Sequence, residues 1–233
     1  MKKLITIVVC LTAAVFINAQ SLTDIVGKYT EANKLDKISG FKTVRVSAKV
    51  SVMGQDMPIE MWMKNPNKIK TVTTFNGQDI VQAYDGEKGY MINPMAGTAD
   101  VTEMSEDQVK ELTRNNIFQN YMEKYLKDGI LTLEGEDTVK GNKAFKIKAA
   151  LPGGNNTHLF IDKISYLLVK TEADINQGGM EMTVDSYPSD YTLNNGIMMP
   201  MKTTSSMGGM DMVMTVTKVE VDTPIEDSIF KLK

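Results

Sequence analysis

The chain has 233 residues, and its 26 basic and 29 acidic residues give a formal net charge of −3. This slightly acidic balance argues against nucleic acid as a partner, because proteins that bind it carry a clustered basic face. Only one histidine and one cysteine are present, which leaves too few groups for a histidine-rich metal cluster or a Ser-His-Asp site with a spare base, so we expect no enzyme, catalytic residue, metal or cofactor.

Residues 1–19 have the pattern of a secretory signal peptide. Lys2 and Lys3 form its positive start, residues 4–17 form its apolar stretch, and Ala19 stands before the expected cleavage point. The apolar stretch is shorter than the roughly 20 residues that cross a bilayer as a helix. We therefore expect a soluble exported protein that does not span the membrane, with one mature domain at residues 20–233. Cys10 lies in the removed segment, so the mature chain has no thiol chemistry.

The mature chain is predicted to begin with a helix and to continue as a meander of strands. Ser21 and Asp24 fit a helix cap, and four apolar residues then fall on one helical face: Leu22, Ile25, Val26 and Tyr29. Five short strands follow, at Phe41–Met53, Met57–Lys64, Lys68–Phe75, Gln78–Tyr84 and Lys88–Ile92. Asn-Gly and Asp-Gly pairs between them favour tight hairpin turns. Strands this close together can pair only as an antiparallel meander.

Two motifs in this meander carry a family resemblance. The first is Met61-Trp62-Met63-Lys64-Asn65-Pro66-Asn67, and the second runs from Tyr84-Asp85-Gly86 to Tyr90-Met91-Ile92-Asn93-Pro94. Together they resemble the LolA-like outer-membrane lipoprotein-sorting proteins, which are periplasmic carriers with an open β-barrel and helices in its mouth. The motif positions are Trp62, Asn65, Pro66, Asp85, Gly86, Asn93 and Pro94.

The resemblance also implies a cargo and partners. The implied cargo is the acyl chains of lipoproteins or of other lipids, and the implied partners are an inner-membrane release machinery and an outer-membrane acceptor. In the family, an Arg directly before the Pro tethers a lid through several hydrogen bonds. This chain has Asn65 there, and a short uncharged amide cannot reproduce the Arg fork. We expect the carrier to be a monomer.

The second half is predicted to hold one more helical region and then strands again. The helical region starts at Ser105 and carries an apolar stripe that could cover a cavity as a lid: Ile117, Phe118, Tyr121, Met122, Tyr125 and Leu126. The alternative is an amphipathic helix docked permanently on the sheet. Seven strands follow, at Ile130–Val139, Lys143–Ala150, Thr157–Asp162, Tyr166–Ile175, Met180–Tyr187, Ile197–Ser205 and Asp211–Val221. We therefore predict a mainly β domain, a single antiparallel and incompletely closed barrel of about 11–12 strands with helices covering its mouth.

Methionine is the unusual component, with 18 residues, and many of them alternate along predicted strands. Residues at period two share one side of a strand, and methionine suits a deformable apolar surface. Because wide barrels tend to hold ligands, we predict an apolar cavity lined by Met61, Met63, Tyr84, Tyr90, Phe145, Met180, Met182, Met199, Met201, Met210, Met212 and Met214. Three alternatives stay open, namely an ordinary methionine core, a Cu(I) site around Met207–Met212, and a structural or interaction barrel without lipid cargo.

Other polar residues carry no functional prediction. His158 lies in a predicted strand and is interpreted as a surface or hydrogen-bonded histidine, and pairs such as Glu134 and Glu136 as parts of a solvated face. The sequence thus predicts a carrier or chaperone that binds acyl chains in an apolar cavity during transport across the envelope.

Overall fold

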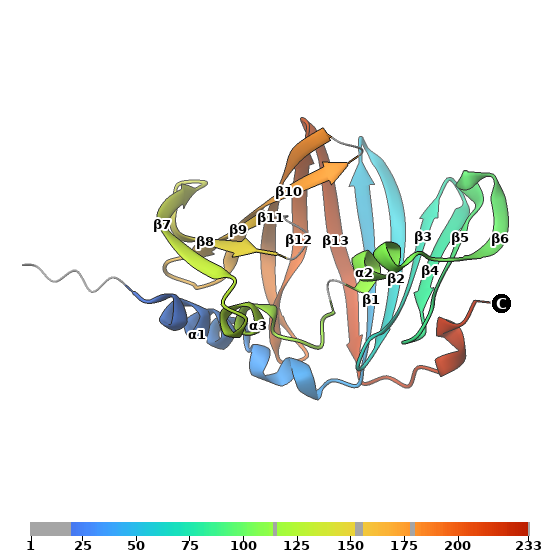
Figure 1. The fold of residues 1–233 in the computed structure, drawn as a ribbon, viewed down its shortest axis with the longest axis horizontal. Coiled ribbons are helices and arrows are strands. Elements are labelled where there is room, and N and C mark those ends of the chain that lie inside the picture. Colours follow the sequence, from blue (N-terminus) through green and yellow to red (C-terminus); the bar gives the residue numbers. More distant parts are fainter. Residues whose placement is uncertain (1–19, 114–115, 152–155, 178–179, 233) are drawn as a thin grey trace, which may run out of the picture.

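The computed structural model describes residues 20–113, 116–151, 156–177 and 180–232 (Figure 1). The predicted signal peptide lies outside the described residues. Thirteen strands in the described part form one antiparallel sheet, so the predicted mainly β class is confirmed. Their bounds are β1 (Thr43–Val52), β2 (Gln55–Lys64), β3 (Lys68–Phe75), β4 (Gln78–Tyr84), β5 (Gly89–Asn93), β6 (Thr98–Glu103), β7 (Leu131–Val139), β8 (Asn142–Ala150), β9 (Asn156–Asp162), β10 (Leu168–Gln177), β11 (Met180–Asn194), β12 (Ile197–Met207) and β13 (Met210–Val221).

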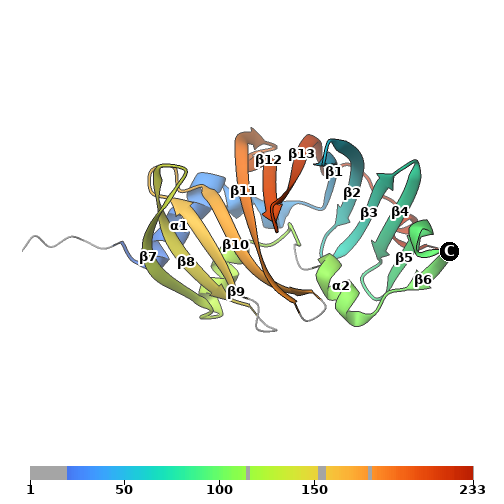
Figure 2. The same cartoon turned by 90° about the horizontal axis from the view of Figure 1, so that it is seen from above.

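The strand order is β6-β5-β4-β3-β2-β1-β13-β12-β11-β10-β9-β8-β7, so two meanders join where β1 pairs with β13. The edge strands β6 and β7 lie at opposite ends of the molecule in Figures 1 and 2. The sheet curls without closing by hydrogen bonds, which agrees with the predicted open barrel. The strand absent from the prediction is β6, a short polar segment that pairs with β5. The 3-10 helix η2 (Pro94–Ala96) lies between these two strands in the sequence.

Helices lie along one end of the curled sheet. α1 (Leu22–Asn33), the 3-10 helix η1 (Leu35–Gly40) and α3 (Tyr121–Lys127) lie along the lower end of the strands in Figure 1. Ser21 and Asp24 form the predicted capping box of α1. A further 3-10 helix, η3 (Asp227–Phe230), contacts β3 near the end of the chain. In the described part of the chain, every helix is too short or too polar to serve as a membrane-spanning segment.

The prediction of one helical region from Ser105 to Leu126 is wrong. The chain forms α2 (Glu106–Thr113) and α3, and the residues between them that the structure describes are not helical. Asn116 is one reason, because its side-chain oxygen accepts a hydrogen bond from the Phe118 backbone N–H at 2.9 Å, a local bond that competes with the helix. Asn120 then caps α3 by accepting from the Glu123 N–H. Ile117 and Phe118 therefore do not belong to a helical stripe.

Alternation along the strands divides the core between the two faces of the sheet. Phe145 and Ile147 on β8 pack with Ile25 and Val26 of α1 and with Met122 of α3, and we call this face the inner face. A second inner cluster contains Val44, Val46, Ala48, Met63 and Phe118. The opposite, outer face carries a small cluster of Val139, Ala144 and Phe160. The helices thus cover part of the inner face, and Ile117 and Phe118 cover another part.

Two glycines in different surroundings give a stability prediction. A Cβ added at Gly89 in β5 would lie 2.5 Å from a methyl group of Val109 in α2 and 3.2 Å from Met104, whereas nothing lies within 4 Å at Gly27 in the exposed middle of α1. We expect Gly89→Ala to lower the free energy of unfolding by about 1–3 kcal/mol through overpacking, and Gly27→Ala to raise it by about 0.5–1 kcal/mol. Urea titrations measure both, and a Gly89→Ala protein as stable as the wild type would contradict the close packing of α2 on β5.

Candidate functional site

Two cavities adjoin on the inner face. The first, called here the η1 cavity, measures about 300 Å³ and lies between η1 and strands β1, β12 and β13; its walls include Leu35, Ile38, Val46, Met199, Val219 and Val221. The second, called here the α3 cavity, measures about 460 Å³ and lies between α3 and strands β8, β9 and β10; its walls include Tyr121, Met122, Tyr125, Leu159, Ala173 and Ile175. Tyr29 and Leu168 line both cavities, so they form the partition between them.

The wall of the η1 cavity follows from the register of β1 and β13. Val44 lies opposite Val221, and Val46 lies opposite Val219, so these valines share the inner face. One extra residue in β13, Thr217, forms a bulge against Ser47 and donates its hydroxyl to the Ser47 carbonyl at 3.0 Å. The extra residue shifts the alternation of side chains by one position. Val219 and Val221 therefore lie on the inner face, on the same side as the inner-facing residues of β13 that precede the bulge.

The cavity walls are mostly apolar and nearly free of charge. Among the described residues, the η1 cavity has no charged lining residue, and the α3 cavity has one, Asp174. Tyr191 donates its hydroxyl to the Leu168 carbonyl at 2.8 Å, and burial raises its pKa well above the usual range. Burial also raises the pKa of Tyr29 to about 12. Both phenols are therefore neutral near physiological pH, and the site can bind an apolar ligand but offers no ionised group at its centre.

The predicted lining residues occupy several different places. Met199 lines the η1 cavity, and Met182 lies opposite Ile175, a wall residue of the α3 cavity. Phe145 belongs to the core beneath α1 and α3. Met61, Met63 and Met214 belong to the cluster around Phe118. The side chain of Met180 lies outside the described residues.

The remaining predicted lining residues are not brought into either cavity. Met210 and Met212 are 48% and 43% exposed, because this end of β13 extends beyond the helices. Met201 is half-buried on β12 and Tyr90 half-buried on β5. Tyr84 donates its hydroxyl to the Gly86 carbonyl at 2.8 Å and so closes the turn after β4. Valine, leucine, isoleucine and tyrosine therefore supply more of the cavity walls than methionine does.

The predicted lid residues also lie in several different places. Tyr121, Met122 and Tyr125 line the α3 cavity, whereas Ile117 lines the η1 cavity. Leu126 packs against the core of α1 and β8. Phe118 is 8% exposed and fills the inner face of β1 and β2. Residues 116–120, called here the connecting segment, thus lie across the inner face.

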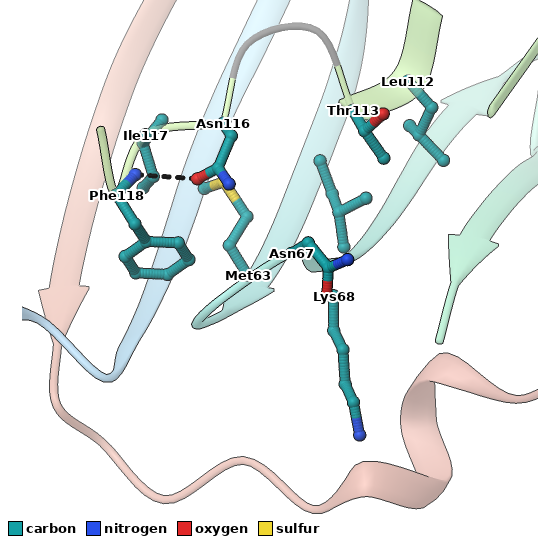
Figure 3. Close-up of a pocket in the computed structure, with 9 residues that line it drawn as sticks. Met63, Asn67, Lys68, Leu112, Thr113, Asn116, Ile117 and Phe118 are labelled. Atoms are coloured by element: carbon teal, nitrogen blue, oxygen red, sulfur yellow. Dashed lines mark hydrogen bonds between the residues drawn. The ribbon is translucent and has the colours of Figure 1, made fainter. Parts of the chain in front are cut away.

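Figure 3 shows Asn116, Ile117 and Phe118 of the connecting segment near Asn67 and Lys68, where β3 begins after the turn from β2. The side-chain amide of Asn116 donates to the Pro66 carbonyl at 2.7 Å, and its backbone N–H donates to the Tyr121 hydroxyl at 2.7 Å. Met63, Leu112 and Phe118 surround a hollow of about 20 Å³ there, room for about one water molecule. At the other end of the segment, Asn120 donates to the Thr30 hydroxyl of α1 at 2.9 Å.

Among the described residues, the motif position that holds Arg in the LolA-like family makes no side-chain hydrogen bond to the connecting segment. The side-chain amide of Asn65 donates instead to the Phe41 carbonyl at 2.9 Å, at the start of β1. The contact between this turn and the segment is made by the next residue, Pro66, through Asn116.

Other motif residues shape turns or lie on the outer face. Asp85 accepts from the backbone N–H groups of Lys88 and Glu87, and the Lys88 bond is the main cause that lowers the pKa of Asp85. Gly86 has a φ of 104°, which favours glycine. Asn93 accepts from the Met95 N–H where η2 begins at Pro94. Trp62 stacks between Arg45 and Lys70, with ring distances of 5.3 and 5.8 Å. These roles organise the fold around the site without touching a cavity.

The single histidine also lies away from the cavities. His158 has one ring nitrogen 3.4 Å from a carboxylate oxygen of Glu134 and the other 3.9 Å from Glu172. Lys170, between Glu172 and Asp185, extends the group across the outer face. This is a network of partly exposed ion pairs, of the kind that contributes little to stability.

Sequence reasoning missed three residues that shape the site, namely Leu168, Tyr191 and Asn116. Two consecutive asparagines at positions 115 and 116 could have indicated the break between α2 and α3, because asparagine favours turns. No local pattern distinguishes Leu168 or Tyr191, since their place depends on how β10 and β11 pack against α1.

Solved structures share this fold, although no protein-family model and no curated protein matches the sequence. A putative outer-membrane lipoprotein-sorting protein domain from Vibrio parahaemolyticus is 11% identical, with a TM-score of 0.59 over 90% of this chain and 97% of that one. A DUF1329 family protein from Desulfovibrio piger is 14% identical, with a TM-score of 0.59 over 89% and 97%. A LolA superfamily protein from Nitrosomonas europaea is 12% identical, with a TM-score of 0.56 over 85% and 96%. This chain therefore has the LolA-like fold.

Proposed function

We propose that the protein is a periplasmic carrier that binds the acyl chains of lipids or lipoproteins and moves them across the envelope. The pair of adjoining apolar cavities of about 300 and 460 Å³ carries this proposal. Pockets of this size bury small ligands, and apolar walls without an ionised centre suit hydrocarbon chains. The fold shared with a lipoprotein-sorting domain supports the same function. No catalytic role is assigned to any residue of the site.

A carrier must also release what it binds. Each buried methylene contributes about 0.8 kcal/mol, so full burial of a lipid anchor with tens of methylenes would exceed the range in which non-covalent complexes exchange. Cavities of limited volume avoid this problem, because they enclose only part of long chains. The rest of the cargo stays outside, where a membrane or an acceptor can compete for it.

Native mass spectrometry tests the proposal. Protein purified from its own periplasm should carry a lipid or lipoprotein, and its polypeptide mass should correspond to cleavage after Ala19. After removal of the lipid, the protein should bind the neutral apolar dye 1-N-phenylnaphthylamine, and added lipids should displace the dye. Protein without bound lipid that also fails to bind the dye would contradict the carrier function.

One observation favours a second candidate, a Cu(I) site of methionine thioethers. Met207 lies directly opposite Met210 across the turn between β12 and β13, and Met212 follows on the same face. Met210 and Met212 are exposed, and thioethers are soft ligands suited to Cu(I).

The variant Met210→Leu, Met212→Leu, Met214→Leu separates the two candidates. For a lipid carrier, dye affinity should stay within about threefold of wild type, because leucine nearly conserves volume and polarity and none of the three residues lines a cavity. For a copper protein, a stoichiometric Cu(I) complex should form in the wild type and be lost in the variant. Such a complex, together with no dye binding in the wild type, would replace the carrier proposal.

A further inference from the structure

Tyr29 is held firmly in the partition between the two cavities. It follows Ile25 and Val26 by about one helical turn, and these two residues are 0% and 1% exposed in the core under α1. The side-chain amide of Asn33 donates to the Tyr29 carbonyl at 2.8 Å. Because buried residues precede and follow Tyr29 in α1, the helix holds the backbone of Tyr29 beside the two cavities.

Among the described residues, the hydroxyl of Tyr29 has no hydrogen-bond partner, and the residue is only partly buried. In the same part of the chain, every fully buried side-chain nitrogen or oxygen does have a partner. The Tyr29 oxygen must therefore retain some accessible surface, and the described spaces that Tyr29 lines are the two cavities. Tyr191 differs, because its hydroxyl already donates to the Leu168 carbonyl. Tyr29 thus supplies a free hydroxyl where the two cavities adjoin, whereas other polar lining residues, such as Asn33 and Tyr125, line one cavity only.

A free phenol in apolar surroundings favours a particular kind of ligand atom. In the empty protein water can reach this accessible hydroxyl, but a ligand that displaces the water leaves the hydroxyl unpaired, at a cost, unless the ligand itself supplies an acceptor. Burial keeps the phenol protonated, with its pKa raised to about 12, so it acts as a donor over the physiological range. A buried carboxylate would be costly without a cationic partner, and the η1 cavity has no charged lining residue among those described. A neutral ester or amide carbonyl is the acceptor that fits.

The volumes on the two sides of Tyr29 suggest how many chains the ligand has. A methylene group fills about the same volume as a liquid water molecule, roughly 30 Å³. On that scale the η1 cavity holds about ten methylenes and the α3 cavity about fifteen. The two spaces meet at Tyr29 and Leu168, so a branched molecule can place one chain in each space with its branch at the partition.

We propose that the cargo is a lipid with two acyl chains, one in each cavity, and that the Tyr29 hydroxyl donates a hydrogen bond to an ester or amide carbonyl at the branch. This inference rests on the proposed carrier function and specifies its substrate class. It makes Tyr29 the residue that distinguishes acyl chains, which carry a carbonyl, from alkyl ether chains, which do not.

The test compares two matched lipids that differ only in this carbonyl. Dioctanoyl phosphatidylcholine and its dioctyl ether analogue, both below their critical micelle concentrations, are titrated against dye-loaded wild type, Tyr29→Phe and Tyr191→Phe. In the wild type the ester should displace the dye about fivefold better than the ether, which is the typical effect of one neutral hydrogen bond. Tyr29→Phe should remove this preference by weakening ester binding alone. Tyr191→Phe should keep the preference, because its hydroxyl is already bonded within the protein.

Thermal unfolding supplies a check on the variants. Tyr29→Phe removes no hydrogen bond among the described residues and should leave the Tm unchanged or higher, whereas Tyr191→Phe should lower it. A single-chain octanoyl lysolipid should bind more weakly than the two-chain ester. Equal ester and ether affinities in the wild type, or an unchanged preference in Tyr29→Phe, would overturn the role of Tyr29. Equal binding of the lysolipid would overturn the two-chain cargo, and failure of every lipid to displace the dye would overturn the carrier function itself.

Discussion

Replacing Val219 with Trp should weaken the binding of an apolar ligand at least about 100-fold. Val219 lies on the inner face of β13 and lines the η1 cavity, so an indole there would occupy space that a ligand chain needs. Each buried methylene contributes roughly 0.8 kcal/mol of binding free energy, so excluding four of them weakens binding by about 3 kcal/mol. This corresponds to slightly more than two orders of magnitude in affinity. Dye displacement by dioctanoyl phosphatidylcholine measures the loss.

The neighbouring residue provides a matched control. Lys218 precedes Val219 in β13, lies on the outer face opposite Ser47, and has a side chain that is 63% exposed. Lys218→Trp adds the same indole to the same strand without entering a cavity, so ligand affinity should stay within about twofold of wild type. Because the cavity has room for the new side chain, Val219→Trp should keep a far-ultraviolet circular dichroism spectrum like that of the wild type. Normal ligand affinity in a folded Val219→Trp protein would exclude the η1 cavity as the binding site.

The strand pattern of this protein is readable from its sequence because its turns are short and chemically distinct. Asn76-Gly77 and Asp85-Gly86 occupy the turns that flank β4, and each bounds a run of β-prone residues. β6 is not predicted from the sequence, because its segment, Thr98–Glu103, contains few apolar residues. It forms a strand by pairing with β5. Local chemistry thus predicts the strands that have their own signals, but not one that depends on a neighbour.

The cavity walls were harder to predict, because period-two alternation groups side chains without saying what covers them. Met210, Met212 and Met214 do share one face of β13 through their pairing with β1 and β12. Only Met214 lies where the Phe118 cluster covers the sheet, whereas Met210 and Met212 are exposed beyond it. How far a helix or a connecting segment reaches along a strand is a tertiary property that no local pattern records.

Tyr29 shows the same limit at a single residue. The apolar face of α1 could be predicted from the spacing of Leu22, Ile25, Val26 and Tyr29, and all four contribute to the core beneath the helix. That spacing treats tyrosine as an apolar ring. Its free hydroxyl between two cavities depends on the packing of Leu168 from β10 on the other side of the partition.

The connecting segment gives the second large expected effect, on the rate of ligand exchange. Asn116→Asp keeps the oxygen that accepts from the Phe118 N–H, but replaces the amide that donates to the Pro66 carbonyl with a second acceptor. The hydrogen bond to the turn between β2 and β3 is then lost, and the new carboxylate oxygen repels the carbonyl oxygen of Pro66. If the segment must move for ligands to pass, association and dissociation rates should both rise about tenfold, since one hydrogen bond contributes about 0.5–1.5 kcal/mol and repulsion adds to its loss.

Affinity should change little in this variant, because the tether is absent from the open state and present in the closed state with or without ligand. Stopped-flow measurement of dye fluorescence gives both rate constants. Asn93→Asp is the control for added charge, since Asn93 lies outside both cavities and its oxygen caps η2; its rates should match the wild type. Unchanged rates in a folded Asn116→Asp protein that still binds the dye would mean that the connecting segment is a fixed part of the core. Ligands would then reach the cavities through the uncovered part of the inner face, where β13 extends beyond the helices.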